Sequence, residues 1–240
     1  HARNAVLKSD LATWQDVVAK SGAKARGYNS LGLAYADIGL TDSAIENYLA
    51  AIRIEPYFAN AYCNLGLAYE KSGFTDRAVE SYLAAIMIQP YFAKAHYNLG
   101  LAYEKSGFMD RAVESYLTAI RIEPWFAEAH NNLGLAYAKT GLTDKAVEEF
   151  LTAIKINPYF VMAYNNLGNA YFVAGELDYA IDTYKMAIGM SPGDVDTRFN
   201  LAMAYKRKGM IKEAVSEFNE VLKLNPADEQ AKTEILAPGQ

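Results

Sequence analysis

The fold is decided by residues 59–92, ANAYCNLGLAYEKSGFTDRAVESYLAAIMIQPYF, and by residues 93–126, AKAHYNLGLAYEKSGFMDRAVESYLTAIRIEPWF. The second stretch repeats the first at 26 of 34 positions. The same step of 34 residues runs along the chain, where prolines mark it at Pro56, Pro90, Pro124, Pro158, Pro192 and Pro226. So strict a period indicates an array of supersecondary units, each of which buries its apolar face only against its neighbours.

Each repeat reads as two helices joined by a short turn. Within residues 59–92, apolar residues recur at helical spacing both before and after Gly73. Gly73 is placed to end the first helix in a left-handed conformation. Thr75 or Asp76 is placed to cap the second helix, and Pro90 forbids its continuation. No alternation typical of strands occurs anywhere in the chain.

These features carry a family resemblance. The pattern Tyr62-x-x-Leu65-Gly66-x-x-Tyr69, followed by Gly73, Ala78, Tyr82, Ala85 and Pro90, resembles the tetratricopeptide repeat (TPR). Gly66 and Ala78 are small where two helices must approach closely. The resemblance implies an all-α, right-handed α-solenoid of helix-turn-helix TPR units with a concave inner face. The six expected repeats are 25–58, 59–92, 93–126, 127–160, 161–194 and 195–228.

The chain ends depart from the repeat pattern. Residues 1–24 are expected to form a degenerate N-terminal capping helix over 9–20, starting at Ser9 and Asp10. Residues 229–240 are expected to form a short capping helix over 229–236 and a frayed tail. The first segment is also similar to the stretch after the last membrane span in polytopic, glycosyltransferase-like proteins with a TPR tail. An ordinary degenerate repeat is the alternative.

Composition excludes several classes of protein. The 240 residues are 52% hydrophobic and carry a net charge of −5, which favours a soluble, folded chain and argues against nucleic-acid binding. Cys63 is the only cysteine, so neither a disulfide framework nor a multi-cysteine zinc site is possible within one chain. The uncharged stretch 156–175 is not apolar enough for a membrane span, because it holds Asn157, Pro158, Asn165, Asn166, Gly168 and Asn169. No signal peptide is recognised. The sequence does not assign the protein to a cellular compartment.

Catalytic motifs are missing from the sequence. It has no glycine-rich phosphate loop, no HExxH and no Gly-x-Ser-x-Gly, so we expect no enzyme activity, no cofactor and no metal. His96 and His130 lie one repeat apart and could be metal ligands, but aromatic replacement at a packing position explains them better. Cys63 is expected to be a small free thiol on the groove side of its helix.

The expected binding surface is the concave groove, which the first helix of each repeat lines in this family. The sixth residue of that helix is asparagine five times in succession, at Asn64, Asn98, Asn132, Asn166 and Asn200. Each amide offers a donor and an acceptor, so this asparagine ladder could bind the main chain of an extended peptide. The arrangement is similar to that of the TPR superhelix in O-GlcNAc transferases. Hydrogen bonds between neighbouring first helices are the alternative.

Other predicted groove contacts are Tyr97, Asn131, Asn165 and Asn169. An anchor for an acidic or C-terminal group is predicted from the aromatic side chains Phe172 and Phe199 beside the cations Lys206 and Arg207. Packing of the two phenylalanines across the repeat interface is the alternative. TPR adaptors that clamp a C-terminal carboxylate carry a lysine at the fifth position, where this chain has none.

The sequence thus predicts a non-catalytic protein–protein interaction scaffold that binds an extended peptide or partner helix in its groove. Alternatives are an accessory domain of a membrane glycosyltransferase-like protein and a homotypic assembly module that stacks through its terminal repeats. Most of the 18 tyrosines recur at four repeat positions and are expected to be a packing signature, which leaves Tyr97 as the tyrosine predicted to contact a ligand.

Overall fold

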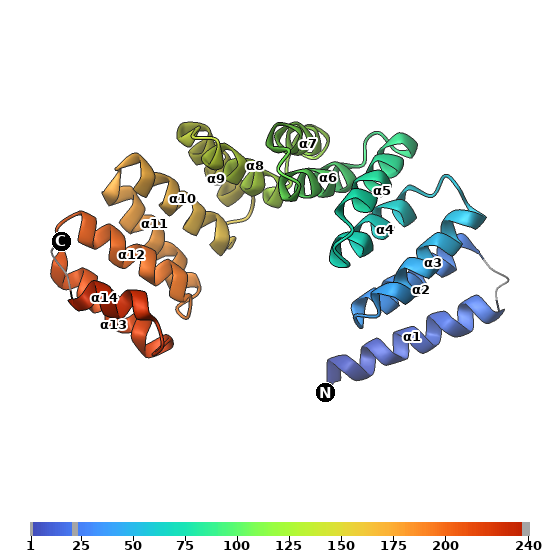
Figure 1. Ribbon diagram of the computed structural model, residues 1–240, viewed down its shortest axis with the longest axis horizontal. Coiled ribbons are helices and arrows are strands. Elements are labelled where there is room, and N and C mark those ends of the chain that lie inside the picture. The colour runs from blue at the N-terminus through green and yellow to red at the C-terminus, as the bar shows by residue number, and fades with distance from the viewer. Residues whose placement is uncertain (1, 21–23, 237–240) are drawn as a thin grey trace. The chain divides into compact units, whose positions relative to one another are not determined.

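The computed structural model describes residues 2–20 and 24–236, and every regular element within those two ranges is an α-helix (Figure 1). The first helices of the repeats are α2 (Ala25–Asp37), α4 (Ala59–Lys71), α6 (Ala93–Lys105), α8 (Ala127–Lys139), α10 (Val161–Ala174) and α12 (Val195–Arg207). The second helices are α3 (Thr41–Ile54), α5 (Thr75–Ile88), α7 (Met109–Ile122), α9 (Thr143–Ile156), α11 (Leu177–Met190) and α13 (Ile211–Leu224). The predicted all-α helical-repeat class is confirmed.

The helices fall into two compact units, which we call the N-terminal unit, ending at Pro124, and the C-terminal unit, beginning at Trp125. The N-terminal unit holds α1 to α7 and the C-terminal unit holds α8 to α14. Within each unit, a first helix packs on its own second helix, and that second helix packs on the next first helix. A hairpin therefore buries its apolar face against the following hairpin, as a stacked array requires.

The terminal helices differ in how well the sequence predicts them. Helix α1 spans Ala2–Lys20, so the expected start at Ser9 and Asp10 is wrong. The residues before Ser9 include no glycine or proline, and nothing stops the helix from extending to them. Helix α14 spans Glu229–Leu236, as expected, and packs on α13. The expected frayed tail, 237–240, lies outside the described residues.

Glycine ends the first helix in each repeat, as predicted. Gly73 has a φ of +82°, and its counterparts in the other five repeats have φ between +79° and +84°. At this conformation the N–H of Gly73 donates to the Glu70 carbonyl and the N–H of Phe74 donates to the Tyr69 carbonyl. These two bonds satisfy carbonyls at the helix end, and only glycine adopts the required φ at little cost.

The expected capping of the second helices is wrong. Helix α5 begins at Thr75, so Phe74 occupies the cap position and no side chain caps the helix. The ring of Phe74 instead lies edge-on to Tyr69 at a centroid distance of 6.4 Å. The apolar contact that accompanies the glycine turn therefore takes the place where a polar cap would sit. Side-chain capping occurs at Asp194 before α12 and at Asp228 before α14.

Small residues allow the two helices of a repeat to touch. A Cβ atom on Gly66 would lie 2.5 Å from Cε1 of Tyr82, far inside the contact distance. The corresponding glycines of the other four repeats that carry one meet an aromatic ring in the same way, so that the five distances are 2.4 to 2.7 Å, and the sixth repeat has Ala202 at this position. Ala78 has no exposed surface. The predicted close approach at Gly66 and Ala78 is confirmed, and the aromatic ring fills the space that these residues leave.

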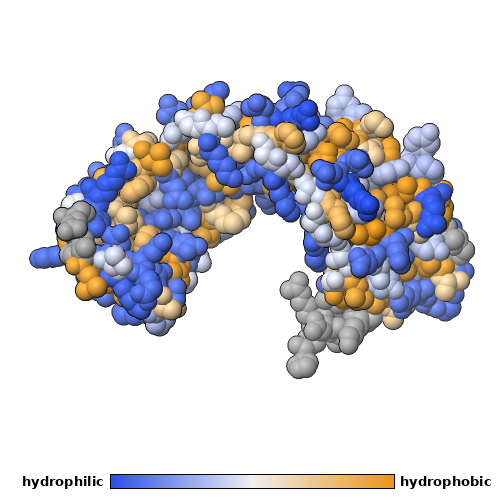
Figure 2. Space-filling view, viewed as in Figure 1, coloured by the Kyte–Doolittle hydropathy of each residue, from blue (hydrophilic) through white to orange (hydrophobic). Residues whose placement is uncertain are grey.

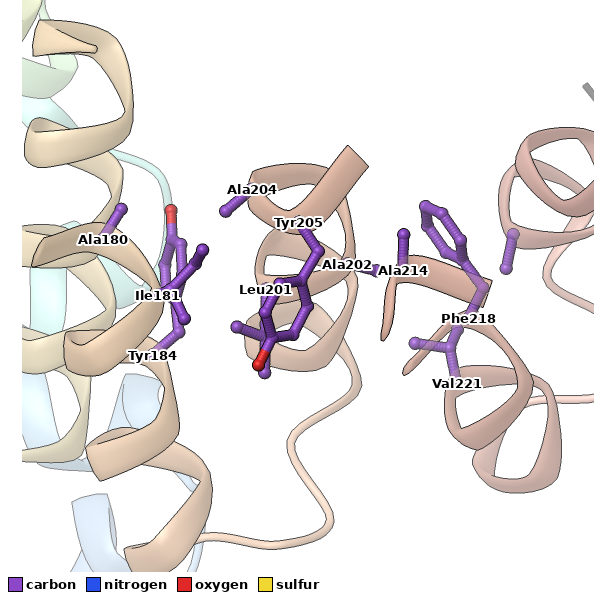
Figure 3. Close-up of a cluster of buried hydrophobic side chains, with 11 residues drawn as sticks. Ala180, Ile181, Tyr184, Leu201, Ala202, Ala204, Tyr205, Ala214, Phe218 and Val221 are labelled. Carbon is purple, nitrogen blue, oxygen red and sulfur yellow. The ribbon is translucent and has the colours of Figure 1, made fainter. Parts of the chain in front are cut away.

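The core is continuous from one repeat to the next within a unit. In the C-terminal unit, Ile181 and Tyr184 point from α11 toward α12, which contributes Leu201 to the cluster (Figure 3). Phe218 from α13 lies on the far side of α12 and is 1% exposed. Helix α12 is therefore covered by aromatic side chains from the second helices on either side of it, and burial of these rings stabilises the packing.

Alkaline pH should destabilise the protein through its buried tyrosines. Burial, with the Asp37 charge nearby, raises the pKa of Tyr48 to about 12, and burial also raises the pKa of Tyr82, Tyr116 and Tyr184. Above pH ~10 the unfolded chain loses phenolic protons that the folded chain keeps, so the free energy of unfolding falls. We expect constant stability from neutral pH to pH ~10 and a steep decrease above it.

Urea unfolding at a series of pH values tests this expectation. The Tyr184→Phe variant should show a shallower alkaline decrease than the parent chain, because one of the shifted groups is gone. An alkaline decrease of the same slope in both proteins would contradict the assignment to Tyr184.

In the described ranges, no helix is long and apolar enough to cross a membrane. The uncharged stretch 156–175 begins at the last residue of α9, crosses the turn between α9 and α10 and contains all of α10.

Candidate functional site

The candidate site is the surface that the first helices present at their second, fifth, sixth, ninth, twelfth and thirteenth residues. We call these residues the groove face, and treat it separately in each unit. In the N-terminal unit they come from α2, α4 and α6, and in the C-terminal unit from α8, α10 and α12.

The asparagine ladder connects neighbouring first helices. Asn64 Nδ2 donates to Asn29 Oδ1 at 2.9 Å in the N-terminal unit. In the C-terminal unit Asn166 Nδ2 donates to Asn131 Oδ1 at 2.9 Å, and Asn200 Nδ2 donates to Asn165 Oδ1 at 3.2 Å. Each bond runs from the sixth residue of one helix to the fifth residue of the preceding one. The ladder thus has a structural role, which the sequence left as the alternative to ligand contact.

Two predicted contact residues are buried beneath this surface. Asn98 and Asn131 are each 3% exposed. Asn98 Nδ2 donates to the sulfur of Cys63 at 3.6 Å, and Asn131 Nδ2 donates to Asn132 Oδ1 at 3.1 Å. Cys63 is a free thiol only 1% exposed, so it lies under the groove face rather than on it, and burial raises its pKa. We do not keep Asn98 and Asn131 among the proposed ligand contacts.

The partly buried asparagines keep unused hydrogen-bonding atoms. Asn169 Oδ1 accepts from Tyr184 Oη at 2.7 Å and from Asn200 Nδ2 at 3.1 Å, which leaves its Nδ2 as a donor. Asn166 and Asn200 donate through Nδ2, which leaves Oδ1 of each as an acceptor. No fully buried side-chain polar atom in the described part of the chain lacks a partner. The unused amide atoms are therefore accessible to water or to a ligand.

Beneath the groove face, two buried tyrosines donate hydrogen bonds to glutamate carboxylates. Tyr82 Oη donates to Glu70 at 3.0 Å, and Tyr116 Oη donates to Glu104 at 2.8 Å. Burial is the main cause that raises the pKa of both tyrosines, and the bound carboxylates raise it further. Both phenols therefore remain protonated donors, and each holds a glutamate in place.

Two repeats carry phenylalanine instead of tyrosine in this column. Phe150 replaces the tyrosine in the repeat where the glutamate position is Ala138, so a hydroxyl there would have no such acceptor. Phe218 faces a repeat with Lys206 at that position. The absence of glutamate does not by itself require phenylalanine, because Tyr48 lies in a repeat with Ala36 at that position and Tyr184 donates to Asn169 instead. Sequence reasoning missed the two tyrosine–glutamate pairs, whose members lie twelve residues apart.

The predicted acidic-group anchor has internal partners. Lys206 Nζ lies 2.7 Å from Glu234 of α14. Arg207 Nη1 donates to the Phe172 carbonyl at 2.7 Å, and its guanidinium lies 4.9 Å from the centre of that ring. The ring of Phe199 lies edge-on to that of Phe218, at a centroid distance of 5.4 Å.

An open pocket of about 440 Å³ adjoins Phe199, and its remaining lining comes from α14: Glu229, Gln230, Thr233 and Glu234. Carboxylates of the chain itself thus stand where the sequence predicted a ligand carboxylate. Glu234 therefore already neutralises the charge of Lys206.

Tyr97 is half-buried, and its ring lies 5.9 Å from that of Tyr116. It is therefore only partly accessible on the groove face.

The two histidines make side-chain contacts that belong to the fold. His96 Nε2 lies 3.0 Å from the Pro90 carbonyl, where Tyr164 and Arg198 make the same contact in later repeats. His130 Nδ1 lies 2.6 Å from Glu149. This pair is replaced by Arg198 and Glu217 two repeats later, at 3.0 Å. The described residues hold no cluster of three potential metal-ligating His, Cys, Asp or Glu side chains.

One tyrosine column is not a packing signature. Tyr57, Tyr91 and Tyr159 are 81 to 83% exposed, and Trp125 in the same column is 76% exposed. Gly193 occupies the column in the next repeat, so the fold does not require an aromatic ring there. The expectation that this column serves packing is wrong.

Family models match most of the chain. The TPR repeat model matches residues 32–73, 75–107 and 109–141. Tetratricopeptide repeat models match 93–124, 127–160, 161–194 and 195–228. A search of curated proteins finds no match.

Solved structures show the same architecture. The structure of MamA is 30% identical, with a TM-score of 0.63, and the match covers 68% of this chain and 95% of that one. YrrB, described as a TPR protein with an unusual peptide-binding site, is 21% identical over 79% of this chain and 97% of its own, with a TM-score of 0.67.

A chain of the APC/C hetero-tetramer Cut9–Hcn1 is 19% identical, with a TM-score of 0.79. That match covers 98% of this chain but only 46% of the longer one. The similarities to O-GlcNAc transferases and to glycosyltransferase-like membrane proteins stay hypotheses. The repeat models cover well over half of the sequence, and the chain belongs to the tetratricopeptide repeat family.

Proposed function

We propose that this chain is a protein–protein interaction scaffold whose groove face binds an extended peptide segment of a partner. Helical repeats of this kind present extended surfaces rather than enclosed reaction sites. The observation that carries the proposal is the set of unused amide atoms in the C-terminal unit. Asn166 and Asn200 offer acceptors and Asn169 offers a donor, which are the groups that a peptide main chain needs.

The ladder can serve both roles at once. One atom of each amide fixes the spacing of neighbouring first helices, and the other remains for the ligand. Because the first bond fixes the side chain, little rotational freedom is lost when a peptide binds. Contacts to main-chain atoms also tolerate different peptide sequences, so the partner segment is selected by its extended conformation and by neighbouring side chains.

Replacement of Asn132, Asn166 and Asn200 by alanine should weaken binding of a groove peptide by about tenfold or more, because several hydrogen bonds are lost together. Peptides would first be selected from a synthetic library on the immobilised chain, and their affinities then measured by fluorescence polarisation. The variant should remain helical, with a free energy of unfolding lower by about 1 kcal/mol for each lost interhelix bond.

A matched control removes three asparagines outside the groove face. Asn47, Asn157 and Asn225 each accept or donate one local hydrogen bond, so their replacement by alanine should lower stability similarly and leave peptide affinity unchanged. Equal affinity of the ladder variant and this control for every selected peptide would refute the role of the ladder in binding.

A further inference from the structure

The N-terminal unit carries exposed cations that its own carboxylates do not neutralise. Lys71, Lys94 and Lys105 lie on the groove face of α4 and α6 and are exposed. Among the described residues, none of the three has a carboxylate within ion-pair distance. Lys71 Nζ has one weak contact, with the Ala36 carbonyl at 3.5 Å. This differs from Lys206 of the C-terminal unit, which Glu234 neutralises. We call these three residues the lysine row.

The glutamates next to Lys71 and Lys105 point toward buried tyrosines rather than toward the lysines. Glu70 and Glu104 precede Lys71 and Lys105 directly, but each accepts a hydrogen bond from a buried tyrosine, Tyr82 or Tyr116. Both glutamates are half-buried, whereas the lysines are exposed. On α4 and α6 the charges that a ligand meets first are consequently the three lysines, whereas α2 presents one exposed charge of each sign, Arg26 and Asp37.

Apolar side chains accompany the lysines at a fixed distance along the helix. Leu67 and Leu101 lie four residues before Lys71 and Lys105, on the same helix face. Leu33 is 42% exposed and Leu67 is 37% exposed, while Leu101 is half-buried. Hydrophobic side chains are also visible over α4 and α5 in the space-filling view (Figure 2). Leu33, Leu67 and Leu101 form the leucine row, which repeats with the same 34-residue step.

The two rows together specify the chemistry of an occupant. When apolar side chains of a ligand cover partly exposed leucine side chains, the free energy of the complex is lowered. Exposed lysines without counter-charges attract carboxylates at the rim and favour association. A nucleic-acid backbone would satisfy the lysines but leave the leucines uncovered, and the net charge of −5 opposes it.

We infer that the groove face of the N-terminal unit binds an acidic peptide segment with interspersed leucine-like side chains. Its apolar side chains cover the leucine row, and its aspartates or glutamates contact the lysine row. This inference rests on the proposed function and adds the chemical class of the partner segment to it. The C-terminal unit offers neutral amides, and its Lys206 and Arg207 already have partners within the unit, so we assign it main-chain contacts.

The test uses a short labelled peptide that alternates leucine and aspartate, and a matched peptide with lysine in place of aspartate. The parent chain should bind the acidic peptide and not the basic one. The triple variant Lys71→Gln, Lys94→Gln, Lys105→Gln should bind the acidic peptide about tenfold more weakly, since each rim charge makes a small contribution. Added salt should weaken binding to the parent more than to the variant.

The matched control removes three exposed cations from the second helices: Arg53→Gln, Arg121→Gln and Lys155→Gln. It changes the net charge equally and should keep the parent affinity. Equal losses in both triple variants would show a general charge effect and overturn the inference. Competition by a single-stranded oligonucleotide that also depends on the lysine row would overturn it in favour of a nucleic-acid partner.

A leucine variant separates this inference from the proposed function. Leu67→Ser with Leu101→Ser should weaken the acidic peptide further, and thermal unfolding checks that the chain remains folded. If the leucine and ladder variants weaken peptide binding and the lysine variant does not, the groove still binds peptides but does not select acidic ones. If none of the three weakens it, both proposals fail.

Discussion

Replacement of Gly168 by alanine should lower the free energy of unfolding by about 3 kcal/mol, although alanine is the better helix former. The added Cβ would lie 2.4 Å from Cε1 and 2.6 Å from Cδ1 of Tyr184. Tyr184 is 1% exposed and its hydroxyl donates to Asn169, so the ring can move aside only by breaking that bond and shifting α11 away from α10. Thermal unfolding should show a lower Tm, by about 10 °C.

Gly189→Ala is the matched control for this substitution. Gly189 lies in α11, and a Cβ there meets no atom within 4 Å. The intrinsic preference of alanine for helix should leave this variant as stable as the parent or more stable by about 0.5 kcal/mol. A Gly168→Ala variant as stable as Gly189→Ala would show that the two helices of the repeat do not pack as closely as described.

Replacement of Phe150 by alanine should cost about 4 kcal/mol, which is the range observed for buried aromatic side chains. The ring is 1% exposed and packs among Ala146, Leu167 and Ala170, with Gly134 directly against it. The surrounding residues are already small, so the structure cannot collapse into the space that the ring leaves. Urea unfolding should show a lower midpoint with an unchanged m value.

Leu151→Ala is the control, because Leu151 is the next residue of α9 and is 46% exposed. Its loss should cost no more than about 1 kcal/mol. A further variant, Phe150→Tyr, restores the residue of four other repeats but places a hydroxyl opposite Ala138, and should cost about 1 to 3 kcal/mol for an unpaired group. Equal stability of all three variants would contradict the assigned packing of this ring.

Much of the fold follows from local chemistry and was predictable. The 34-residue step, the glycine that ends each first helix and the small residues at the helix contact all depend on backbone conformation or side-chain volume. Such properties belong to a residue and its position in the repeat. The sequence was a weaker guide where two interactions compete for one position, as at Phe74, where apolar packing on Tyr69 replaces the expected polar cap.

The candidate site was only partly predictable. Repeat register places Asn98 and Asn166 at equivalent positions, yet Asn98 is buried against Cys63 and Asn166 keeps an accessible oxygen. Register gives the helix face of a side chain, but its partner depends on the residue that the neighbouring helix supplies. The same limit applies to Lys206, whose counter-ion comes from Glu234, 28 residues later.

By itself, the sequence determined the repeat family, the helical hairpins and the helix face on which each polar residue lies, because these depend on periodicity and on the preferences of single residues. The tertiary structure decided which of those polar residues are already satisfied within the chain. It assigned the ladder amides to neighbouring helices, neutralised Lys206, and left Lys71, Lys94 and Lys105 exposed. The physical reason is that hydrogen bonds and ion pairs join residues from different helices, and their formation depends on distances that only packing sets.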